Sequence, residues 1–223
     1  MATALIFDCD GVLIDSEPLS VAELGASLRE AGAEITDNEI FVRMVGLSIA
    51  KILDIVRREY GVDAAPYIED FRLRLEQRFA ASLQPIEGIA DALDALADLP
   101  RAVASSSTPS RLEQTLTLTN LKPRLAPHIY SASLVKNGKP APDLFLYAAE
   151  KIGAAPQDCI VIEDSAHGVE AAHAAGMQVI GFTGGGHAEA ARLGARLPQL
   201  HPDALVAHAA ELPETIRKLI AAR

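Results

Sequence analysis

The segment FDCDGVLIDSE, residues 7–17, places Asp8, Asp10 and Asp15 directly after an apolar run, with Gly11 inside the cluster. Carboxylates this close together repel one another, and a strand-ending turn usually needs only one aspartate beside a glycine. A bound cation, or a reaction that uses carboxylates, would offset the repulsion. Such a cluster suits metal binding, nucleophilic attack and general acid–base catalysis.

Three further stretches carry groups that suit a metal ion and a phosphate: the serines 105–107, Lys139, and the pair 163–164, Glu and Asp. Carboxylate oxygens are ligands for Mg²⁺, and a lysine with hydroxyl groups can bind the remaining phosphate oxygens. The set predicts phosphoryl transfer through an aspartyl-phosphate, in which one carboxylate attacks phosphorus and a second protonates the leaving alkoxide. Asp8 and Asp10 would share these roles, whereas bracing of the loop is as good an interpretation of Asp15.

Continuous apolar runs precede most of these groups, which favours parallel strands buried on both faces. The predicted strands cover residues 3–7, 102–105, 128–132, 159–163 and 178–182. Helical patterns separate them, so we expect a doubly wound, Rossmann-like α/β fold. Because the carboxyl ends of parallel strands meet at one edge of the sheet, the polar groups are expected to lie together there.

One stretch, from about residue 16 to residue 83, shows helical patterns and no convincing strand. Thr36 and Glu39 form a capping-box pattern, and an amphipathic run over 48–60 ends at a glycine. A second amphipathic run covers 66–83. These helices need a small core of their own, which predicts an inserted helical domain.

The predicted division of the chain is a core formed by residues 1–15 and 85–223, with a helical cap domain at 16–84. The segment QPIEG, residues 84–88, is interpreted as the return hinge. An insertion directly after the first strand lies above the carboxyl end of that strand, where open α/β sheets bind ligands.

Composition narrows the classes of partner. The chain has 223 residues, of which 49% are apolar, and a formal net charge of −10, which argues against nucleic-acid and membrane partners. No run of 18 apolar residues exists, and the N-terminus reaches an acid too soon for a signal peptide. Cys9 and Cys159 suggest free thiols rather than a disulfide framework. We expect a cytoplasmic protein that is a monomer or a weak homo-oligomer.

Taken in order, the motifs DCDGVLIDSE, SSS, GKPAPDLF and IEDSAHGVEAAHAAGM resemble those of the haloacid dehalogenase (HAD) superfamily. The resemblance covers the first fifteen residues and the C-terminal three fifths of the chain. The helical insertion resembles the superfamily's C1 cap in position and character. The most similar branch contains sugar-phosphate phosphatases and β-phosphoglucomutases.

The resemblance implies a role for each matching carboxylate. Asp8 would be the nucleophile and Asp10 the general acid and base. Asp164, with Glu163 directly or through water, would join Asp8 and the Asp10 carbonyl oxygen at Mg²⁺.

It also implies a binding site for the transferring phosphoryl group. Ser105 and Lys139 would contact that group with their side chains. The backbone N–H groups of Cys9, Asp10 and Ser106 would complete the phosphate cradle.

The expected function is a Mg²⁺-dependent phosphatase acting on a small phosphorylated metabolite, either a sugar phosphate or a sugar-acid phosphate. A β-phosphoglucomutase is an alternative, but such mutases carry a histidine and an arginine where this chain has Ser20 and Ile49. Dehalogenases lack the second aspartate, so Asp10 argues against that activity. A catalytically inactive binding or regulatory protein is a further alternative. In the cap, Arg74 is a candidate contact for an anionic substrate.

Overall fold

A parallel β-sheet forms the centre of the computed structural model, which describes residues 3–223. Within these residues the sheet has six strands in the order β3-β2-β1-β4-β5-β6. Their bounds are β1 Ala4–Phe7, β2 Arg101–Ser105, β3 Ile129–Ser131, β4 Cys159–Glu163, β5 Gln178–Phe182 and β6 Ala204–Val206. The α/β fold predicted from the sequence is thereby confirmed, and the predicted strands match β1 to β5. The short edge strand β6 was not predicted.

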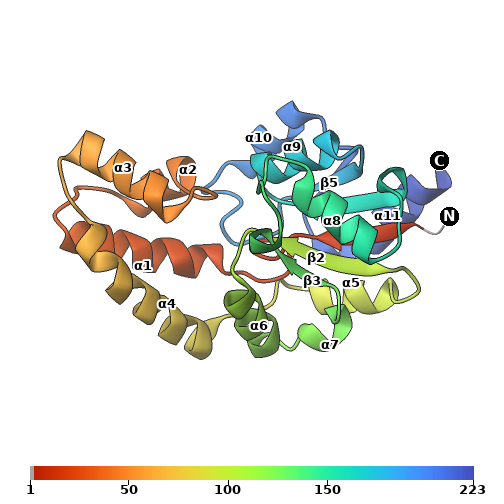
Figure 1. The fold of residues 1–223 in the computed structure, drawn as a ribbon, viewed down its shortest axis with the longest axis horizontal. Helices are drawn as coiled ribbons and strands as arrows, with labels where there is room; N and C mark the ends of the chain where they lie inside the picture. The colour runs from red at the N-terminus through yellow and green to blue at the C-terminus, as the bar shows by residue number, and fades with distance from the viewer. Residues whose placement is uncertain (1–2) are drawn as a thin grey trace.

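Both faces of the sheet are covered by helices, which explains why its strands are continuously apolar. Alternate residues of β1 enter two separate cores: Leu5 and Phe7 face one, Ala4 and Ile6 the other. The first core also contains residues of α5, α6, α7 and α11, and the second contains residues of α8, α9 and α10 (Figure 1). The bounds are α5 Ile89–Ala95, α6 Pro109–Leu118, α7 Lys122–Leu125, α8 Asp143–Lys151, α9 Ala166–Ala174, α10 Leu193–Arg196 and α11 Leu212–Ala221.

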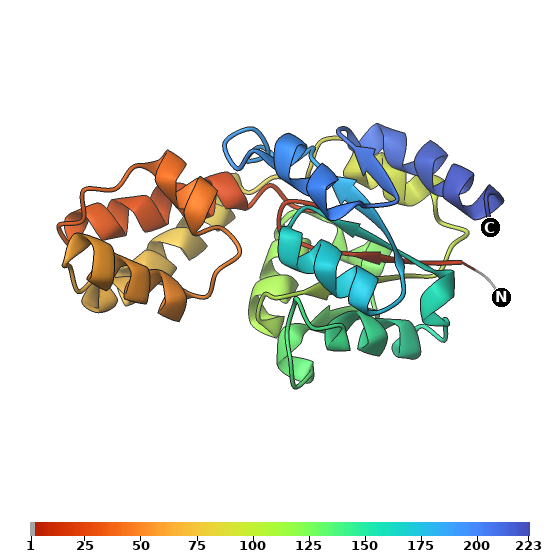
Figure 2. The same cartoon turned by 90° about the horizontal axis from the view of Figure 1, so that it is seen from above.

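The segment between β1 and α5 is helical, as predicted, and lies at one end of the sheet (Figures 1 and 2). It contains α1 Glu17–Glu30, α2 Asp37–Arg43, α3 Ile49–Tyr60 and α4 Ile68–Ser82. The predicted capping box is present, since Thr36 and Glu39 hydrogen-bond reciprocally at the start of α2. Helix α3 ends, as predicted, at Gly61, whose φ of 69° suits a residue without a Cβ.

Two short stretches join the helical segment to the sheet, and they lie side by side. The backbone N–H of Asp15 donates to the carbonyl of Gln84 at 3.0 Å, and that of Ile86 donates to the carbonyl of Leu13 at 3.0 Å. The chain therefore enters and leaves the helical segment at neighbouring points. Residues 1 and 2 of the predicted core domain lie outside the described residues.

Among residues 3–223, no helix combines the length and apolar character that crossing a bilayer requires.

Candidate active site

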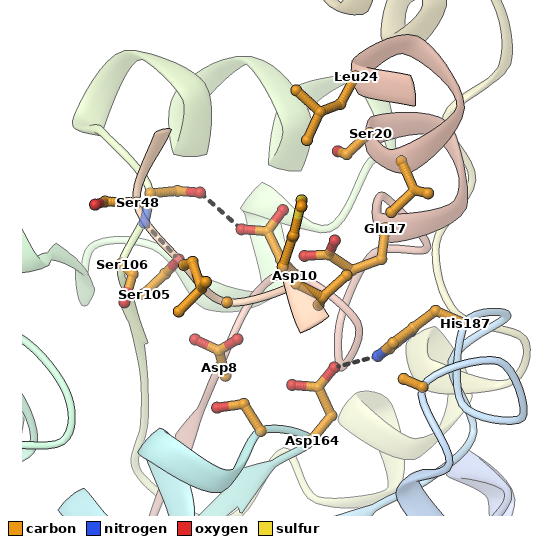
Figure 3. A pocket seen from close by; sticks show the side chains of 18 of the residues that line it. Asp8, Asp10, Glu17, Ser20, Leu24, Ser48, Ser105, Ser106, Asp164 and His187 are labelled. Atoms are coloured by element: carbon orange, nitrogen blue, oxygen red, sulfur yellow. Dashed lines mark hydrogen bonds and ion pairs between the residues drawn. The ribbon is translucent and has the colours of Figure 1, made fainter. Parts of the chain in front are cut away.

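A cavity of about 630 Å³ lies between the carboxyl ends of the strands and the helical segment. The sheet side of this cavity is lined by Asp8, Asp10, the serines 105–107, Lys139 and Asp164. The helical side is mostly apolar and includes Val21, Leu24, Ile40, Met44, Phe71 and Phe79. The structure therefore brings the predicted groups that follow β1, β2 and β4, and Lys139 from the loop before α8, to one cavity. Figure 3 shows Asp8, Ser105 and Asp164 of this set.

Lys139 is the cation at the centre of the carboxylate cluster. Its Nζ lies 2.7 Å from Asp8 Oδ1 and 2.8 Å from Glu163 Oε1, and its side chain is only 5% exposed. Burial by itself lowers the pKa of Lys139, but the charges of Asp8 and Glu163 outweigh burial and raise it. The amine therefore stays protonated, and it offsets part of the repulsion between the acids.

Asp8, Glu163 and Asp164 form a potential metal site, because one oxygen from each lies within 4.8 Å of the others. The pKa values of Asp8 and Asp164 are raised well above the ordinary value, first by burial and then by neighbouring charges that include Glu163. The raised pKa values favour protonation of Asp8 and Asp164 in the metal-free protein, because one lysine cannot balance three buried carboxylates. Full ionisation would leave the cluster with excess negative charge. A hard divalent cation such as Mg²⁺ fits both that charge and the all-oxygen donor set.

Glu163 is held by several donors besides Lys139. Its Oε2 accepts the backbone N–H of Asp164 at 2.8 Å and of Ser165 at 3.2 Å. A Cβ on Gly168 would lie 1.6 Å from Glu163 Oε1, so the close approach of α9 to this carboxylate requires glycine. The local sequence therefore fixes Glu163 against the start of α9.

Asp10 is oriented by groups from three parts of the chain. Its Oδ1 accepts from Ser16 Oγ at 2.6 Å and Arg111 Nη2 at 3.0 Å, and its Oδ2 accepts from Ser107 Oγ at 2.7 Å. Burial raises the pKa of Asp10, but the charge of Arg111 and these hydrogen bonds outweigh burial, so the pKa is lowered. In this arrangement Asp10 is a carboxylate.

The residues predicted to bind phosphate lie beside Asp8. Ser105 is buried at the end of β2, and its Oγ accepts the backbone N–H of Ser107, which shapes the serine loop. Ser106 also lines the cavity. Cys9 is fully buried, and burial, followed by the charges of Asp10 and Asp8, raises the pKa of its thiol.

Arg74 is not brought to the other predicted site residues. Its guanidinium bonds Glu30 and Ser27 on α1, and it does not line the cavity of the described residues. These contacts join α4 to α1, so its role in substrate binding stays a prediction.

Asp15 accepts the backbone N–H of Gly186 at 2.9 Å, which agrees with the loop-bracing interpretation.

Arg111, Glu17 and His187 line the cavity but were not predicted from the sequence. For Arg111 a signal existed: it lies in the first turn of α6, where the helix dipole disfavours a cation. Burial and the charges of Asp10 and Asp164 raise the pKa of Glu17 to about 7. His187 lies in the loop after β5, and its Nε2 is 3.1 Å from Asp164 Oδ2. No motif or spacing in the sequence marks it as a cavity residue.

Comparison with known proteins gives consistent matches. The family model described as haloacid dehalogenase-like hydrolase matches residues 5–182. A 6-phosphogluconate phosphatase of Escherichia coli (strain K12) is 28% identical over 214 residues, which cover 95% of this chain and 93% of that protein. Hexitol phosphatase B of the same strain is 31% identical over 183 residues, covering 79% and 82%. A conserved haloacid dehalogenase-like protein of unknown function from Agrobacterium tumefaciens gives a TM-score of 0.88 at 36% identity, covering 99% of this chain and 100% of that chain.

Proposed function

The chain belongs to the haloacid dehalogenase-like hydrolase family, and from that premise we propose that it is a Mg²⁺-dependent phosphatase. Its substrate is a small phosphorylated metabolite, a sugar phosphate or sugar-acid phosphate, and its intermediate is an aspartyl-phosphate. The names of the two phosphatases described above support this substrate class. The observation that carries the proposal is the ion pair of Lys139 with Asp8 at the floor of the cavity.

Asp8 is the proposed nucleophile because it combines exposure to the cavity with an adjacent cation. Lys139 neutralises part of the charge that would otherwise repel an anionic phosphate. Ser105, Ser106 and backbone N–H groups, including those of Cys9 and Asp10, hold the phosphoryl oxygens. When Mg²⁺ is bound by Asp8, Asp164, the Asp10 carbonyl oxygen and Glu163, directly or through water, it supplies further positive charge for the phosphoryl group.

Asp10 is the proposed general acid and base. It lies two residues after the nucleophile and also lines the cavity, so it can reach the ester oxygen on the side away from Asp8. Asp10 is a carboxylate in the ligand-free arrangement, so it takes up a proton from solvent as the anionic substrate binds beside it. It gives that proton to the leaving alkoxide and afterwards takes one from the water that hydrolyses the intermediate. Both steps use the same side of the cavity.

We further propose that residues 16–84 act as a cap over the site. Helices α1, α2, α3 and α4 supply the far wall of the cavity, and the paired stretches at 13–15 and 84–86 provide the connection to the sheet. Closure of such a wall excludes bulk water and limits the size of the substrate.

The test compares two substitutions on the same loop. Asp8→Asn should lower phosphate release from a panel of sugar and sugar-acid phosphates by at least about 10⁴-fold. Asp15→Asn is the matched control, since Asp15 does not line the cavity and asparagine keeps an acceptor for Gly186. Circular dichroism verifies that both variants fold. Comparable turnover in Asp8→Asn and Asp15→Asn would reject the covalent mechanism.

Mutase activity is the alternative to hydrolysis, and the cavity disfavours it. Ser20 and Ile49, which replace the histidine and arginine of the mutases, both line the cavity. Neither side chain supplies a charge that could hold a bisphosphate for return to the phospho-aspartate. With β-glucose 1-phosphate and a trace of glucose 1,6-bisphosphate, release of inorganic phosphate should exceed formation of glucose 6-phosphate. The reverse order of rates would favour the mutase.

A further inference from the structure

We propose that Arg111 selects substrates that carry a carboxylate in addition to the phosphate ester, so that the enzyme acts on phosphorylated sugar acids in preference to neutral sugar phosphates. This inference rests on the proposed phosphatase function and narrows its substrate class.

Arg111 reaches the cavity from α6, on the side where the leaving group must lie. Its Nη2 is 3.0 Å from Asp10 Oδ1 and 3.5 Å from Ser20 Oγ on α1. Its guanidinium lies over the ring of Phe79 on α4, 5.0 Å from the ring centroid. The cation is therefore positioned between the proposed general acid and the helical segment.

The hydrogen-bonding capacity of this guanidinium is only partly used. Among the described residues, its Nε is buried and has no hydrogen-bond partner, and its single ion pair, with Asp10, uses one nitrogen. A guanidinium presents its N–H donors as a planar fork that matches a carboxylate with two parallel bonds. The arginine thus keeps donors for a second, anionic partner.

The other cations of the cavity have different surroundings. Lys139 is enclosed by Asp8 and Glu163. Arg72 pairs with Glu69 at the rim, where its side chain is 61% exposed. Arg196 of α10, which also lines the cavity, is exposed and donates from Nη1 to the carbonyl oxygen of Ala191 at 3.4 Å. Arg111 is accordingly the cation that an anionic part of the leaving group would meet beside Asp10.

Distance sets which substrates can use this contact. Three hydrogen bonds in series separate an ester oxygen that Asp10 protonates from a ligand oxygen bound to Arg111: ester oxygen to Asp10, Asp10 to Nη2, and guanidinium to ligand oxygen. Together they span at most about 9 Å. A carboxylate on the same short carbon chain can reach that position. Ser20, Ser110 and Gln114 line the same side of the cavity and offer neutral partners for sugar hydroxyl groups.

A structural role alone explains the placement of Arg111 less well. A cation in the first turn of a helix faces the positive end of the helix dipole. The ion pair with Asp10 offsets part of that cost, but glutamine could cover Phe79 and still donate a hydrogen bond to Asp10 without any charge. A ligand carboxylate that binds the guanidinium would offset the remaining cost.

The experiment uses matched pairs of substrates with Mg²⁺: 6-phosphogluconate against sorbitol 6-phosphate, and 3-phosphoglycerate against glycerol 3-phosphate. For the wild-type enzyme we expect kcat/KM to be at least about tenfold higher for the acid of at least one pair. In Arg111→Gln, the KM of that acid should rise about 30-fold, the loss typical of a hydrogen bond to a charged group. Because Arg111 also holds Asp10, kcat should fall by a similar factor for both members of the pair. The KM of the neutral partner should change only a few-fold, so the preference for the acid should disappear.

Two further variants complete the test. Arg111→Lys keeps the charge without the fork and should retain part of the preference. Arg72→Gln removes a cation from the rim and should keep the wild-type preference.

Equal wild-type kcat/KM values for acid and neutral members of both pairs, or a preference that survives in Arg111→Gln, would overturn the role of Arg111 while leaving the phosphatase function intact. The wild-type ratio gives this answer even if the glutamine variant does not fold. A different result would show that the proposed phosphatase function is wrong. In that case the wild-type enzyme would release no more phosphate than Asp8→Asn from any substrate, including p-nitrophenyl phosphate.

Discussion

Replacement of Glu17 by glutamine should stabilise the metal-free protein in a pH-dependent way. Glu17 is the first residue of α1 and lines the cavity near Asp10 and Asp164. Burial, followed by the negative charges of these two aspartates, raises its pKa from 4.5 to about 7. In the unfolded chain the same carboxyl ionises near its usual pKa.

The direction in which the free energy of unfolding changes with pH follows from the number of protons that each state binds. Between pH 4.5 and pH 7 the folded protein binds more protons at Glu17 than the unfolded chain does, so the free energy of unfolding falls as pH rises through this window. At about 1.36 kcal/mol for each pH unit, the loss reaches about 3.4 kcal/mol above pH 7. Because the side chain is partly exposed and therefore screened by solvent, we expect about 2 kcal/mol.

The assay is urea unfolding followed by circular dichroism, at pH 5 and pH 8, with a chelator present. Glutamine keeps the shape of the side chain but carries no charge, so the gain in the free energy of unfolding from Glu17→Gln should increase by about 2 kcal/mol between the two pH values. The exposed Glu87, replaced by glutamine, is the matched control and should show little change at either pH. A Glu17→Gln gain that is equal at pH 5 and pH 8 would refute this account of the cavity.

Other substitutions test the remaining contacts. Lys139→Met leaves Asp8 and Glu163 buried without their cation, so the free energy of unfolding in urea should fall by about 3–5 kcal/mol; a loss below about 1 kcal/mol would contradict the burial of this charge. Gly168→Ala must displace Glu163, and Mg²⁺ affinity measured by calorimetry should weaken about tenfold; unchanged affinity would place Glu163 outside the metal site. Asp10→Asn should slow hydrolysis of alkyl phosphates about 10²–10⁴-fold and that of p-nitrophenyl phosphate far less, whereas equal losses would argue against proton donation to the leaving group.

The strands and helix ends could be predicted wherever the local pattern is strong. β4 is, as predicted, a continuous apolar run buried on both faces, and Ser165 caps the helix that follows it. β6 was not predicted, although β3, which is equally short and lies at the other edge of the sheet, was predicted. The difference is exposure, since Leu205 in the middle of β6 is 46% exposed. A half-exposed strand of this length leaves no recognisable apolar run.

The sheet topology predicts that the site residues lie together at one edge of the sheet. It does not predict which side chains form hydrogen bonds or ion pairs with one another. Asp8 and Lys139 are expected near one edge once the strands are placed, and they form an ion pair there. The partners of Asp10 illustrate what the sequence does not show: Ser107 lies 97 residues away along the chain and Arg111 lies 101 residues away. Which side chain points toward which depends on backbone positions that no local pattern specifies.

The adjoining stretches at 13–15 and 84–86 have a consequence for how such an enzyme can diversify. With respect to the sheet, the helical segment between these stretches is one long insertion, and backbone hydrogen bonds join its two ends. The entropy of closing a loop grows only slowly with its length, by about 0.6 kcal/mol for each doubling. The intervening helices can therefore be lengthened, shortened or exchanged as a unit at little cost to the strands that hold the carboxylates. Evolution could in this way replace the part of the cavity that recognises the leaving group while inheriting unchanged the part that breaks the phosphate ester.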